Sequence, residues 1–578
     1  MAVVEQFLKE IRELYNEAKN GKMIELGAFR NRWGIQVSIG EAYQAMCSRE
    51  YKKEKGSFYT PPEIVDFMVD MALEGVDFKT SPMVKVLDPS CGGGAFLIRL
   101  CQVLSKRAEE AGIDYGPFHV LTYNLFGYDT DETAVMISSL ELYEKFHAFP
   151  EHIIHKDFLI DQEEEFDIII GNPPYMGHKI LAGEYRESLQ KLYPQVFFDK
   201  GDIAYCFIKK SIDCLKKNGT LSLITSRYLL EALSGKGIRK YISEKGSMKT
   251  IIDFYGIRPI KGAGVDTMIF EFKKASYDGV PIEFYRLKSS AKSIGSRVLE
   301  LSNLKNEAYT RHISAAPWQL KEEGWSFTGH MEQSIIDKIK GKELRYFCQS
   351  YQGIITGCDR AFVLVKVKAE KLGIEKELLK PWIKNSNIKP FSVDAAEYLL
   401  IYSNNISGDN GKKALEYIGQ YKDRLEKRRE CRNGIRKWYE LQWGRESGMF
   451  QEKKIVFPYK SSSNRFAIDY GSYFSADVYA ITISEMFKSM YTYEFLAGIL
   501  NSSIYEFYIK TMAKKLGEDM YEYYPNKIMT LRIPDYIEEL DLMVKQGGEN
   551  LRERIDDLLC RRLGITPEEY EIIRSWCS

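Results

Sequence analysis

The residues best suited to chemistry follow one another in the chain: Asn172-Pro173-Pro174-Tyr175, directly after the apolar run Phe166–Ile170. Asparagine and two prolines are typical of a rigid turn after a strand. The same residues also place two hydrogen-bond acceptors, the Asn172 side-chain oxygen and the Pro173 carbonyl, in positions that the prolines hold fixed. Two acceptors aimed at the hydrogens of an aromatic exocyclic amine favour a more nucleophilic nitrogen, and Tyr175 can stack on the ring that carries the amine.

A second group of residues indicates a cofactor. The segment Val86–Leu97 reads as a strand, a glycine-rich turn and a helix start, with Asp88, Pro89, Gly92 and Gly94 in the turn. Glycines let the backbone approach a ligand closely, and the turn lacks the lysine of a triphosphate-binding loop. An acid at the strand end suits a cation, and S-adenosylmethionine has both a sulfonium and an ammonium group. Its methyl group is already activated, so we expect no metal site.

Acids also follow the next strands. Asp129 ends the run Leu125–Tyr128, and Asp157-Phe158 comes before the strand of the catalytic turn. Either acid alone is more typical of a solvated loop. At successive strand ends they favour a nucleoside site, where Asp129 would hold the ribose and Asp157 an adenine amine beside the Phe158 ring.

Apolar runs alternate with helical patterns, which predicts a mostly parallel, doubly wound, Rossmann-like α/β sheet. Helices are expected over 1–21, 38–53, 95–110 and 132–146, and another helix after Pro61-Pro62. We expect a helical extension at 1–55, a catalytic domain at 56–278 and an α+β module at 279–578. The predicted strands are Val84–Leu87, Leu125–Tyr128, Phe166–Ile170, Thr220–Thr225, Thr250–Phe254 and Thr267–Phe272.

The order of these motifs resembles the gamma class of amino-methylating DNA methyltransferases, in particular the TaqI-type adenine enzymes. The resemblance covers about Ser57 to Phe272 and begins with Phe58-Tyr59-Thr60-Pro61-Pro62. It implies a class I methyltransferase fold, S-adenosylmethionine as cofactor and transfer to N6 of an adenine flipped out of double-stranded DNA. It also implies that Tyr59 and Thr60 close over the cofactor. The other implied cofactor contacts are Asp88, Pro89, Gly92, Gly94, Asp129, Asp157, Phe158 and Asn172, and the implied catalytic loop is Asn172 to Tyr175.

One family feature has no clear counterpart. The family often places a second aromatic residue against the flipped base, shortly before the strand that here contains Thr267–Phe270. This sequence has Phe254-Tyr255-Gly256-Ile257-Arg258-Pro259 there, and no residue of it is assigned that role.

The region after residue 278 is the expected DNA target-recognition module. Ile354–Leu364 and Lys380–Ile383 resemble the specificity domains of related modification enzymes. The segment Lys422–Arg445 is rich in Lys, Arg and aromatic residues and suits either a solvated helix face or DNA-phosphate contact. A polar loop at 460–465 is a further candidate for reading bases. The candidate DNA-binding residues are Lys460, Ser461, Asn464, Arg465, Arg360 and Lys514.

Four other functions remain open. Asn-Pro-Pro-Tyr also occurs in enzymes that methylate a glutamine amide in release factors, and related loops occur in rRNA methyltransferases. The segment before the glycine loop and the long C-terminal module favour DNA instead. Enzymes that methylate cytosine N4 more often have Ser at the Asn172 position. A noncatalytic DNA-binding or scaffold protein is disfavoured because Asp88, Gly92, Asn172 and Tyr175 are intact.

Composition excludes several classes of protein. The 578 residues have 81 basic and 81 acidic side chains, so binding to DNA would depend on local charge. The chain has no apolar run long enough to span a bilayer, and its 10 cysteines form no C-x-x-C pair. We therefore expect a cytoplasmic protein with no structural zinc and no membrane association. No convincing nuclease centre is present in the sequence, and a solitary, monomeric methyltransferase is expected.

Overall fold

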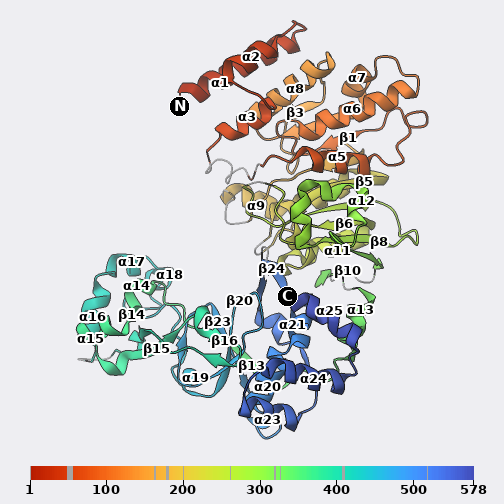
Figure 1. Cartoon of the computed structure of the whole chain (residues 1–578). Helices are drawn as coiled ribbons and strands as arrows, with labels where there is room; N and C mark the ends of the chain where they lie inside the picture. Colours follow the sequence, from red (N-terminus) through yellow and green to blue (C-terminus); the bar gives the residue numbers. More distant parts are fainter. Residues whose placement is uncertain are drawn as a thin grey trace. The chain divides into compact units, whose positions relative to one another are not determined.

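The computed structural model describes residues 2–48, 56, 58–161, 164–177, 181, 183–198, 201–260, 262–317, 320–325, 327, 329–406, 410–516 and 519–577. Two compact units make up the chain (Figure 1): unit 1 is Met1–Phe327 and unit 2 is Thr328–Ser578. Within the described part, no helix is long and apolar enough to cross a membrane.

Unit 1 contains a sheet with nine strands among the described residues, in the order β3-β2-β1-β4-β5-β7-β6-β8-β9. The strands from β3 to β5 are parallel, whereas β7 runs antiparallel to both of its neighbours. This confirms the predicted doubly wound α/β fold. The strands are β1 (Val86–Asp88), β2 (Leu125–Asp129), β3 (Ile153–His155), β4 (Phe166–Gly171), β5 (Leu215–Ser226), β6 (Ser247–Asp253), β7 (Thr267–Lys273), β8 (Ile282–Leu287) and β9 (Thr310–Ala315).

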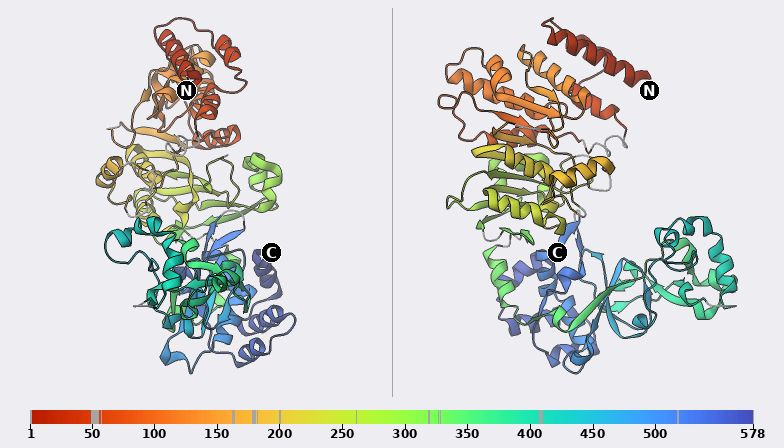
Figure 2. Two further views of the ribbon diagram at one scale, coloured as in Figure 1. Left: turned by 90° about the vertical axis from the view of Figure 1, so that its left-hand side faces the viewer. Right: turned by 180° about the vertical axis from the view of Figure 1, so that it is seen from behind.

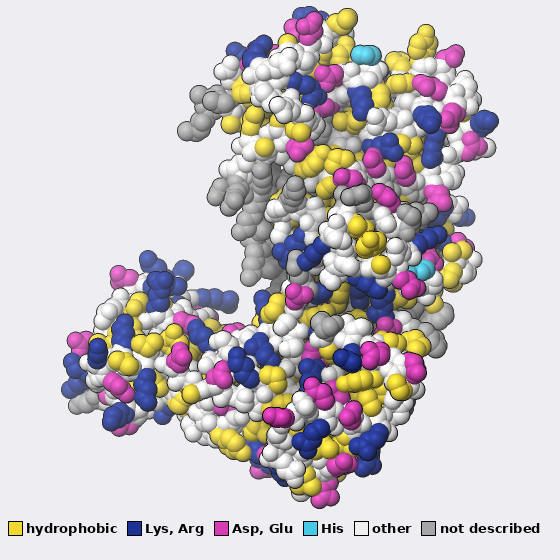
Figure 3. Space-filling view, viewed as in Figure 1, with side chains coloured by type: hydrophobic (Ala, Val, Ile, Leu, Met, Phe, Trp, Pro, Cys, Tyr) yellow, Lys and Arg dark blue, Asp and Glu magenta, His cyan; other side chains and the backbone are white. Residues whose placement is uncertain are grey.

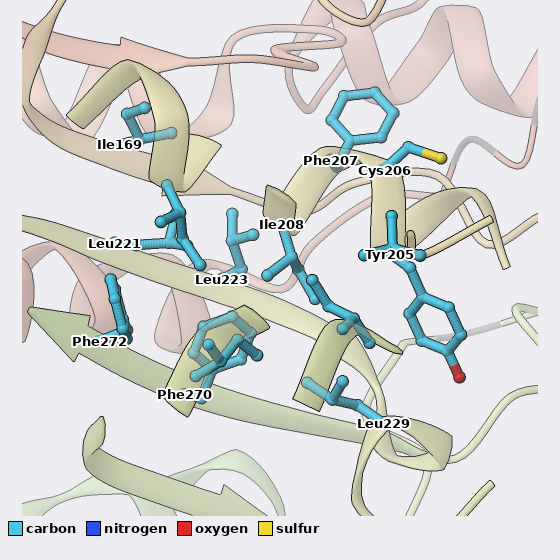
Figure 4. Close-up of a cluster of buried hydrophobic side chains, with 14 of the residues drawn as sticks. Ile169, Tyr205, Cys206, Phe207, Ile208, Leu221, Leu223, Leu229, Phe270 and Phe272 are labelled. Carbon is cyan, nitrogen blue, oxygen red and sulfur yellow. The ribbon is translucent and has the colours of Figure 1, made fainter. Parts of the chain in front are cut away.

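Helices cover both faces of this sheet because its central strands are apolar on both sides. Alternate residues of β5 and β7, among them Leu223 and Phe270, pack with Ile208 of α10 on one face (Figure 4). Ile168 of β4 and its neighbours pack against α5 and α6 on the other face. The helices are α5 (Pro62–Ala72), α6 (Ala95–Glu110), α7 (Gly116–His119), α8 (Glu132–Phe146), α9 (Gly183–Leu192), α10 (Ile203–Cys214), α11 (Lys236–Lys245) and α12 (Leu301–Leu304).

The N-terminal helices belong to unit 1. Helices α1 (Ala2–Lys19), α2 (Leu26–Trp33) and α3 (Ile39–Met46) bury Phe7, Phe29 and Ile39 against α8, and Figure 2 shows α1 at the N-terminal end of the unit. Arg30 of α2 forms ion pairs with Glu141 (2.9 Å) and Glu144 (2.8 Å) of α8. The predicted helix over 38–53 ends at Met46, and residues 49–55 lie outside the described residues.

The boundary between the two units differs from the predicted one at residue 278. Strand β8 pairs with β6, and β9 pairs with β8, so the sheet continues to Ala315. The division falls at Phe327–Thr328 instead. The polar residues within β8 and β9, such as Glu283 and Arg311, hide this continuation from a search for apolar runs.

Unit 2 is an α+β module, and its two largest sheets among the described residues have four strands each, ordered β13-β23-β19-β21 and β14-β18-β15-β22. Its main helices are α13 (His330–Lys338), α14 (Asp359–Phe362), α15 (Lys366–Lys371), α16 (Lys412–Gly419), α17 (Lys422–Glu426), α18 (Arg429–Arg432), α20 (Tyr493–Asn501), α21 (Ser503–Met512), α23 (Glu538–Gln546), α24 (Leu551–Leu563) and α25 (Pro567–Cys577). The sheet strands are β13 (Cys348–Gln352), β14 (Val363–Val365), β15 (Leu379–Ile383), β18 (Tyr398–Ile401), β19 (Lys454–Pro458), β21 (Ala467–Asp469), β22 (Tyr473–Phe474) and β23 (Val478–Ile483).

Candidate active site

A cavity of about 770 Å³ lies at the carboxyl ends of β1, β2 and β4 in unit 1. These strands are parallel neighbours, so the loops that follow them meet at one edge of the sheet. The volume lies within the range of about 300–1,000 Å³ that is usual for small-molecule sites. Ten of the predicted site residues line it: Tyr59, Thr60, Asp88, Pro89, Gly92, Asp129, Asp157, Phe158, Asn172 and Pro174.

Asp88 is the buried acid of this cavity. Its side chain is 1% exposed, and its Oδ1 accepts a hydrogen bond from the Ser90 amide at 3.1 Å. A Cβ at Gly171 would lie 2.6 Å from that oxygen, so glycine leaves room for the carboxylate. Burial raises the pKa of Asp88 to about 8, and the nearby Asp129 adds to the increase. Asp88 has no ion-pair partner among the described residues, so its carboxylate is available to a cation that binds in the cavity.

The glycine loop is anchored to the second strand. The Cys91 amide donates to the Tyr128 carbonyl at 2.9 Å, and the Gly92 amide donates to Asp129 Oδ2 at 2.8 Å. Gly92 has a φ of 51°, in the left-handed region that glycine adopts without strain. Asp129 therefore supports the loop as well as lining the cavity.

Gly94 packs closely against α8. It does not line the cavity, and a Cβ there would lie 2.8 Å from Cβ of Ser138 in α8. Its missing side chain lets the start of α6 pack closely against α8. Its predicted contact with the cofactor stays a prediction.

Helix α3 forms one wall of the cavity, a role that was not predicted for the N-terminal helices. Its lining residues are Gly40, Glu41, Tyr43 and Gln44. A Cβ on Gly93 would lie 2.6 Å from Cα of Gly40, so two glycines make the contact. The Ser38 side chain caps α3 by accepting from the Glu41 amide at 3.0 Å. The sequence offered one signal for this contact, because a glycine within a helical pattern, here Gly40, often has a packing reason.

We predict that Gly93→Ala separates α3 from the glycine loop. The added methyl group meets backbone atoms of Gly40, which have no side chain to move, so unit 1 should lose about 1–3 kcal/mol of stability. Cofactor affinity should fall with it, and urea unfolding and titration calorimetry measure the two effects. Gly183→Ala is the matched control, because nothing lies within 4 Å of its added Cβ. Identical behaviour of the two variants would contradict the packing role.

Asp157 and Phe158 both line the cavity, and each also contacts the protein. Asp157 Oδ1 accepts from the Leu159 amide at 2.9 Å, and its Oδ2 accepts from the Tyr185 hydroxyl at 3.0 Å. Phe158 is 1% exposed and stacks on Phe207, with 5.8 Å between ring centroids. This stacking holds the Phe158 ring in place, so a nucleobase in the cavity would contact a rigid aromatic side chain. An amine that binds Asp157 would compete with the Tyr185 hydroxyl for its Oδ2.

Asn172 lies at the junction of three segments. Its Nδ2 donates to Thr60 Oγ1 at 3.0 Å, and its Oδ1 accepts from the Tyr175 hydroxyl at 2.6 Å. Its backbone carbonyl accepts from the Ser90 hydroxyl at 3.4 Å, which joins the catalytic turn to the glycine loop. Thr60 is 5% exposed, so the amide is held between buried partners.

Two residues of the predicted catalytic turn do not line the cavity: Pro173 and Tyr175. The Tyr175 side chain is 8% exposed and packs in the core with Ile170. Its predicted stacking on a base therefore requires the ring to leave this position. That movement would also release the Asn172 oxygen.

The predicted base-reading loop at 460–465 is largely structural, which corrects the expectation for three residues. Ser461 is buried and accepts from Arg465 at 2.9 Å. Asn464 is 1% exposed and accepts from the Tyr523 hydroxyl at 2.7 Å. Arg465 donates to the Asn385 side chain at 2.7 Å and to the Ile388 carbonyl at 3.2 Å.

The other three DNA-binding candidates remain at the surface of unit 2. Lys460 and Arg360 are exposed, and Lys514 in β24 (Lys514–Leu516) is half-buried. The sequence alone could not distinguish these exposed side chains from the buried Asn464. The hydrogen bonds of the Asn464 amide are made with residues distant in sequence, Leu500 and Tyr523. Among the described residues, no group of three or more His, Cys, Asp or Glu side chains could hold a metal ion.

A doubly wound sheet with this cavity is followed by an α+β module, and comparisons with known proteins find the same order of parts. Residues 123–260 match the Eco57I restriction-modification methylase family, and residues 380–533 match the TaqI-like C-terminal specificity domain. Over these two ranges the chain is therefore similar to a restriction-modification methylase and, further along, to a TaqI-like specificity domain.

Particular relatives extend over most of the chain. Type II methyltransferase M.BstVI of Geobacillus stearothermophilus is 22% identical over 568 residues, which cover 92% of this chain and 99% of the relative. Type II methyltransferase M.HindII of Haemophilus influenzae is 25% identical over 482 residues, covering 77% and 83%. Among solved structures, the Type IIL restriction-modification enzyme MmeI in complex with DNA has a TM-score of 0.66 at 12% identity, covering 93% of this chain and 82% of that chain. At 12% identity, the similarity to MmeI shows a shared fold alone.

Proposed function

We propose that the chain transfers the methyl group of S-adenosylmethionine to the N6 amine of a flipped-out adenine at a specific site in double-stranded DNA. The observation that carries this proposal is the position of Asn172, whose amide lines the same cavity as the buried Asp88. The Type II methyltransferase relatives support DNA as the substrate, and the specificity domain supports recognition of a site.

The lining of the cavity suits the cofactor. Asp88 offers a buried carboxylate to the ammonium group, and Gly92 leaves open space beside the backbone. Asp129, at the end of the next strand, would accept from ribose hydroxyls. Asp157 and Phe158 would meet the cofactor adenine. Bound there, S-adenosylmethionine supplies a methyl group on a sulfonium that leaves as a neutral thioether.

The residues of this chain align and activate the amine. Asn172 Oδ1 accepts one of its hydrogens. The Pro173 carbonyl, which does not line the cavity in this structure, would have to turn toward the amine to accept the other. The two acceptors would leave the nitrogen lone pair directed at the methyl carbon. The new N–C bond forms as the C–S bond breaks, sulfur keeps the bonding electrons, and the nitrogen then releases one proton to solvent. Thr60 holds the Asn172 amide during this step.

Tyr175 would release Asn172 as the amine binds, because its hydroxyl donates to the same side-chain oxygen and competes with the amine for it. A base inside a duplex is out of reach, so the target nucleotide has to leave the stack. We propose that the arriving base displaces Tyr175, whose ring then stacks on it. Base stacking on an aromatic side chain contributes about 1–3 kcal/mol and offsets part of the cost of unstacking.

Cofactor affinity should depend on pH through Asp88. In the free protein its pKa is about 8, and the bound ammonium favours the ionised form, which lowers the pKa in the complex. Affinity should therefore fall by up to about tenfold per pH unit as pH drops below 8. Above pH 8 the ammonium, with a pKa of roughly 7.7–8.0 for an α-amino group, loses its charge and affinity falls again.

Titration calorimetry with S-adenosylhomocysteine between pH 6 and pH 9 measures this profile. In buffers of different ionisation enthalpy, binding at pH 7 should release a proton. A flat profile with no proton release would contradict the contact between Asp88 and the ammonium group.

Single-molecule sequencing tests the proposed function in cells. The chain is expressed in a bacterial strain without adenine methylation of its own, and the sequenced genome should show N6-methyladenine at one short motif. N4-methylcytosine at a motif would keep the fold and mechanism and change the base. No modified base in DNA would overturn the proposal.

Two further expectations stay predictions. Analytical ultracentrifugation checks whether the protein is a monomer, and a DNA cleavage assay with Mg²⁺ checks that it has no nuclease activity.

A further inference from the structure

A second cavity, of about 420 Å³, lies within unit 2 and has no part in the mechanism above. Its walls come from the loop 354–359, from Lys384 after β15, from Arg424 in α17 and from residues 475–477 before β23. Most of these segments fall inside the residues that match the specificity domain, 380–533.

The loop that forms one wall is held in place before any ligand arrives. The Ile354 amide donates to the Phe474 carbonyl at 2.8 Å, and the Arg428 guanidinium donates to the Thr356 carbonyl at 3.1 Å. Gly357 has a φ of 77°, and a Cβ there would lie 2.8 Å from Cδ of Arg428. The cavity is therefore a built feature of the fold.

Two buried side-chain oxygens of the segment 475–477, which lies beside Ile354, have no hydrogen-bond partner within the described chain. Ser475 is 9% exposed, and neither its Oγ nor Oδ1 of Asp477 has a hydrogen-bond partner among the described residues, although both atoms are buried. Burial raises the pKa of Asp477 above its usual value. A buried polar atom left without a partner costs about 1–3 kcal/mol, so these oxygens favour a ligand that supplies hydrogen-bond donors.

Donors face the same cavity. Lys384 Nζ lies 2.9 Å from Asp359 Oδ2, and Asp359 also accepts from the Thr356 hydroxyl at 2.6 Å. The exposed Arg424 has no ion pair with an acid among the described residues. A ligand for this cavity therefore presents donors and acceptors side by side, as the edge of a base pair does in the major groove.

The surface beside the cavity carries positive charge. Arg424, Lys427, Arg429 and Arg432 are exposed on or next to α17 and α18. Figure 3 shows basic side chains gathered over the part of unit 2 that Figure 1 labels α17 and α18. Such a surface can hold DNA phosphates while the neighbouring cavity contacts bases.

We infer that this cavity reads one base pair of the recognition sequence through Asp477, Ser475 and Lys384, while α17 and α18 hold the adjacent phosphates. This inference rests on the proposed function and names specificity residues that the sequence did not reveal. Asp477 would accept from the exocyclic amine of cytosine or adenine, and Lys384 would donate to the partner base.

Asp477→Asn tests it, because the substitution keeps the shape and replaces one acceptor oxygen with a donor. Genomes methylated by the wild type and the variant are compared by single-molecule sequencing. Discrimination at one position of the motif should fall by roughly 10- to 100-fold, with the other positions unchanged. Glu370→Gln, which neutralises an exposed acid of α15 in the same unit, is the control and should keep the motif.

Ser475→Ala keeps the test decisive if Asp477→Asn does not fold, because it removes an oxygen that has no partner within the described chain. It should also relax one position. An unchanged motif in the folded variants overturns the inference, and so does an equal loss of methylation at every site with unchanged discrimination. A wild type that methylates no motif would instead overturn the proposed function.

The phosphate contact has a separate readout. Arg424→Gln should weaken binding to all duplexes and reduce the slope of log affinity against log salt by about 0.9. Fluorescence anisotropy with a labelled duplex measures both quantities. If the slope does not change, Arg424 of α17 does not contact a DNA phosphate, and this part of the inference is wrong.

Discussion

Asn172→Ala is expected to lower the rate of methyl transfer by about 100- to 1,000-fold and to leave cofactor affinity within a few fold. The substitution removes the acceptor that aligns the amine, while Asp88 and the glycine loop stay in place. Single-turnover transfer measures the rate, and calorimetry with S-adenosylhomocysteine measures the affinity.

Two comparisons make this result specific. Asn31→Ala replaces an exposed asparagine of α2 and should transfer at the wild-type rate. Tyr175→Phe keeps the ring and frees the Asn172 oxygen, so it should remain active. Wild-type activity in Asn172→Ala would refute the mechanism, and an equal loss of affinity and rate would show that Asn172 serves the cofactor alone.

Asp88→Asn is expected to weaken cofactor binding by about 10- to 100-fold, because it removes a charge-assisted contact with the ammonium group. The amide oxygen can still accept from the Ser90 amide, so the loop should keep its shape. Calorimetry with S-adenosylhomocysteine measures the loss. Asp114→Asn changes an exposed acid before α7 and should bind normally.

The same variant should be more stable than the wild type without cofactor. The pKa of Asp88 is about 8 in the folded protein and about 3.9 in an unfolded chain, so its ionisation favours unfolding. The wild type thus loses stability as pH rises above about 4, and the loss is complete above pH 8. The melting temperature of Asp88→Asn should exceed that of the wild type at pH 8.5 and match it near pH 4. A less stable variant at pH 8.5 would contradict the burial argument.

The core of unit 1 could be predicted because its strands are continuous apolar runs and its helices are strongly periodic. The helices predicted over 95–110 and 132–146 coincide with α6 and α8. The edge strands escaped prediction for a physical reason. β3 has only three residues, of which Ile154 and His155 are exposed, so it has no apolar pattern.

The site was predictable where a strand end determines it. Asp88, Asp129 and Asn172 come together because parallel strands end at one edge. Contacts between distant segments were hidden, such as Gly40 against Gly93 and Asn464 against Tyr523. Each contact joins residues that are far apart in sequence, so it cannot be predicted from the residue types within one segment.

The central claim is tested most directly by transfer of a labelled methyl group from S-adenosylmethionine to DNA that lacks this modification. The purified chain is incubated with both, and the DNA is digested to nucleosides and separated. Label in N6-methyldeoxyadenosine, lost in Asn172→Ala, is the predicted result. Label in RNA or protein with none in DNA would contradict the account.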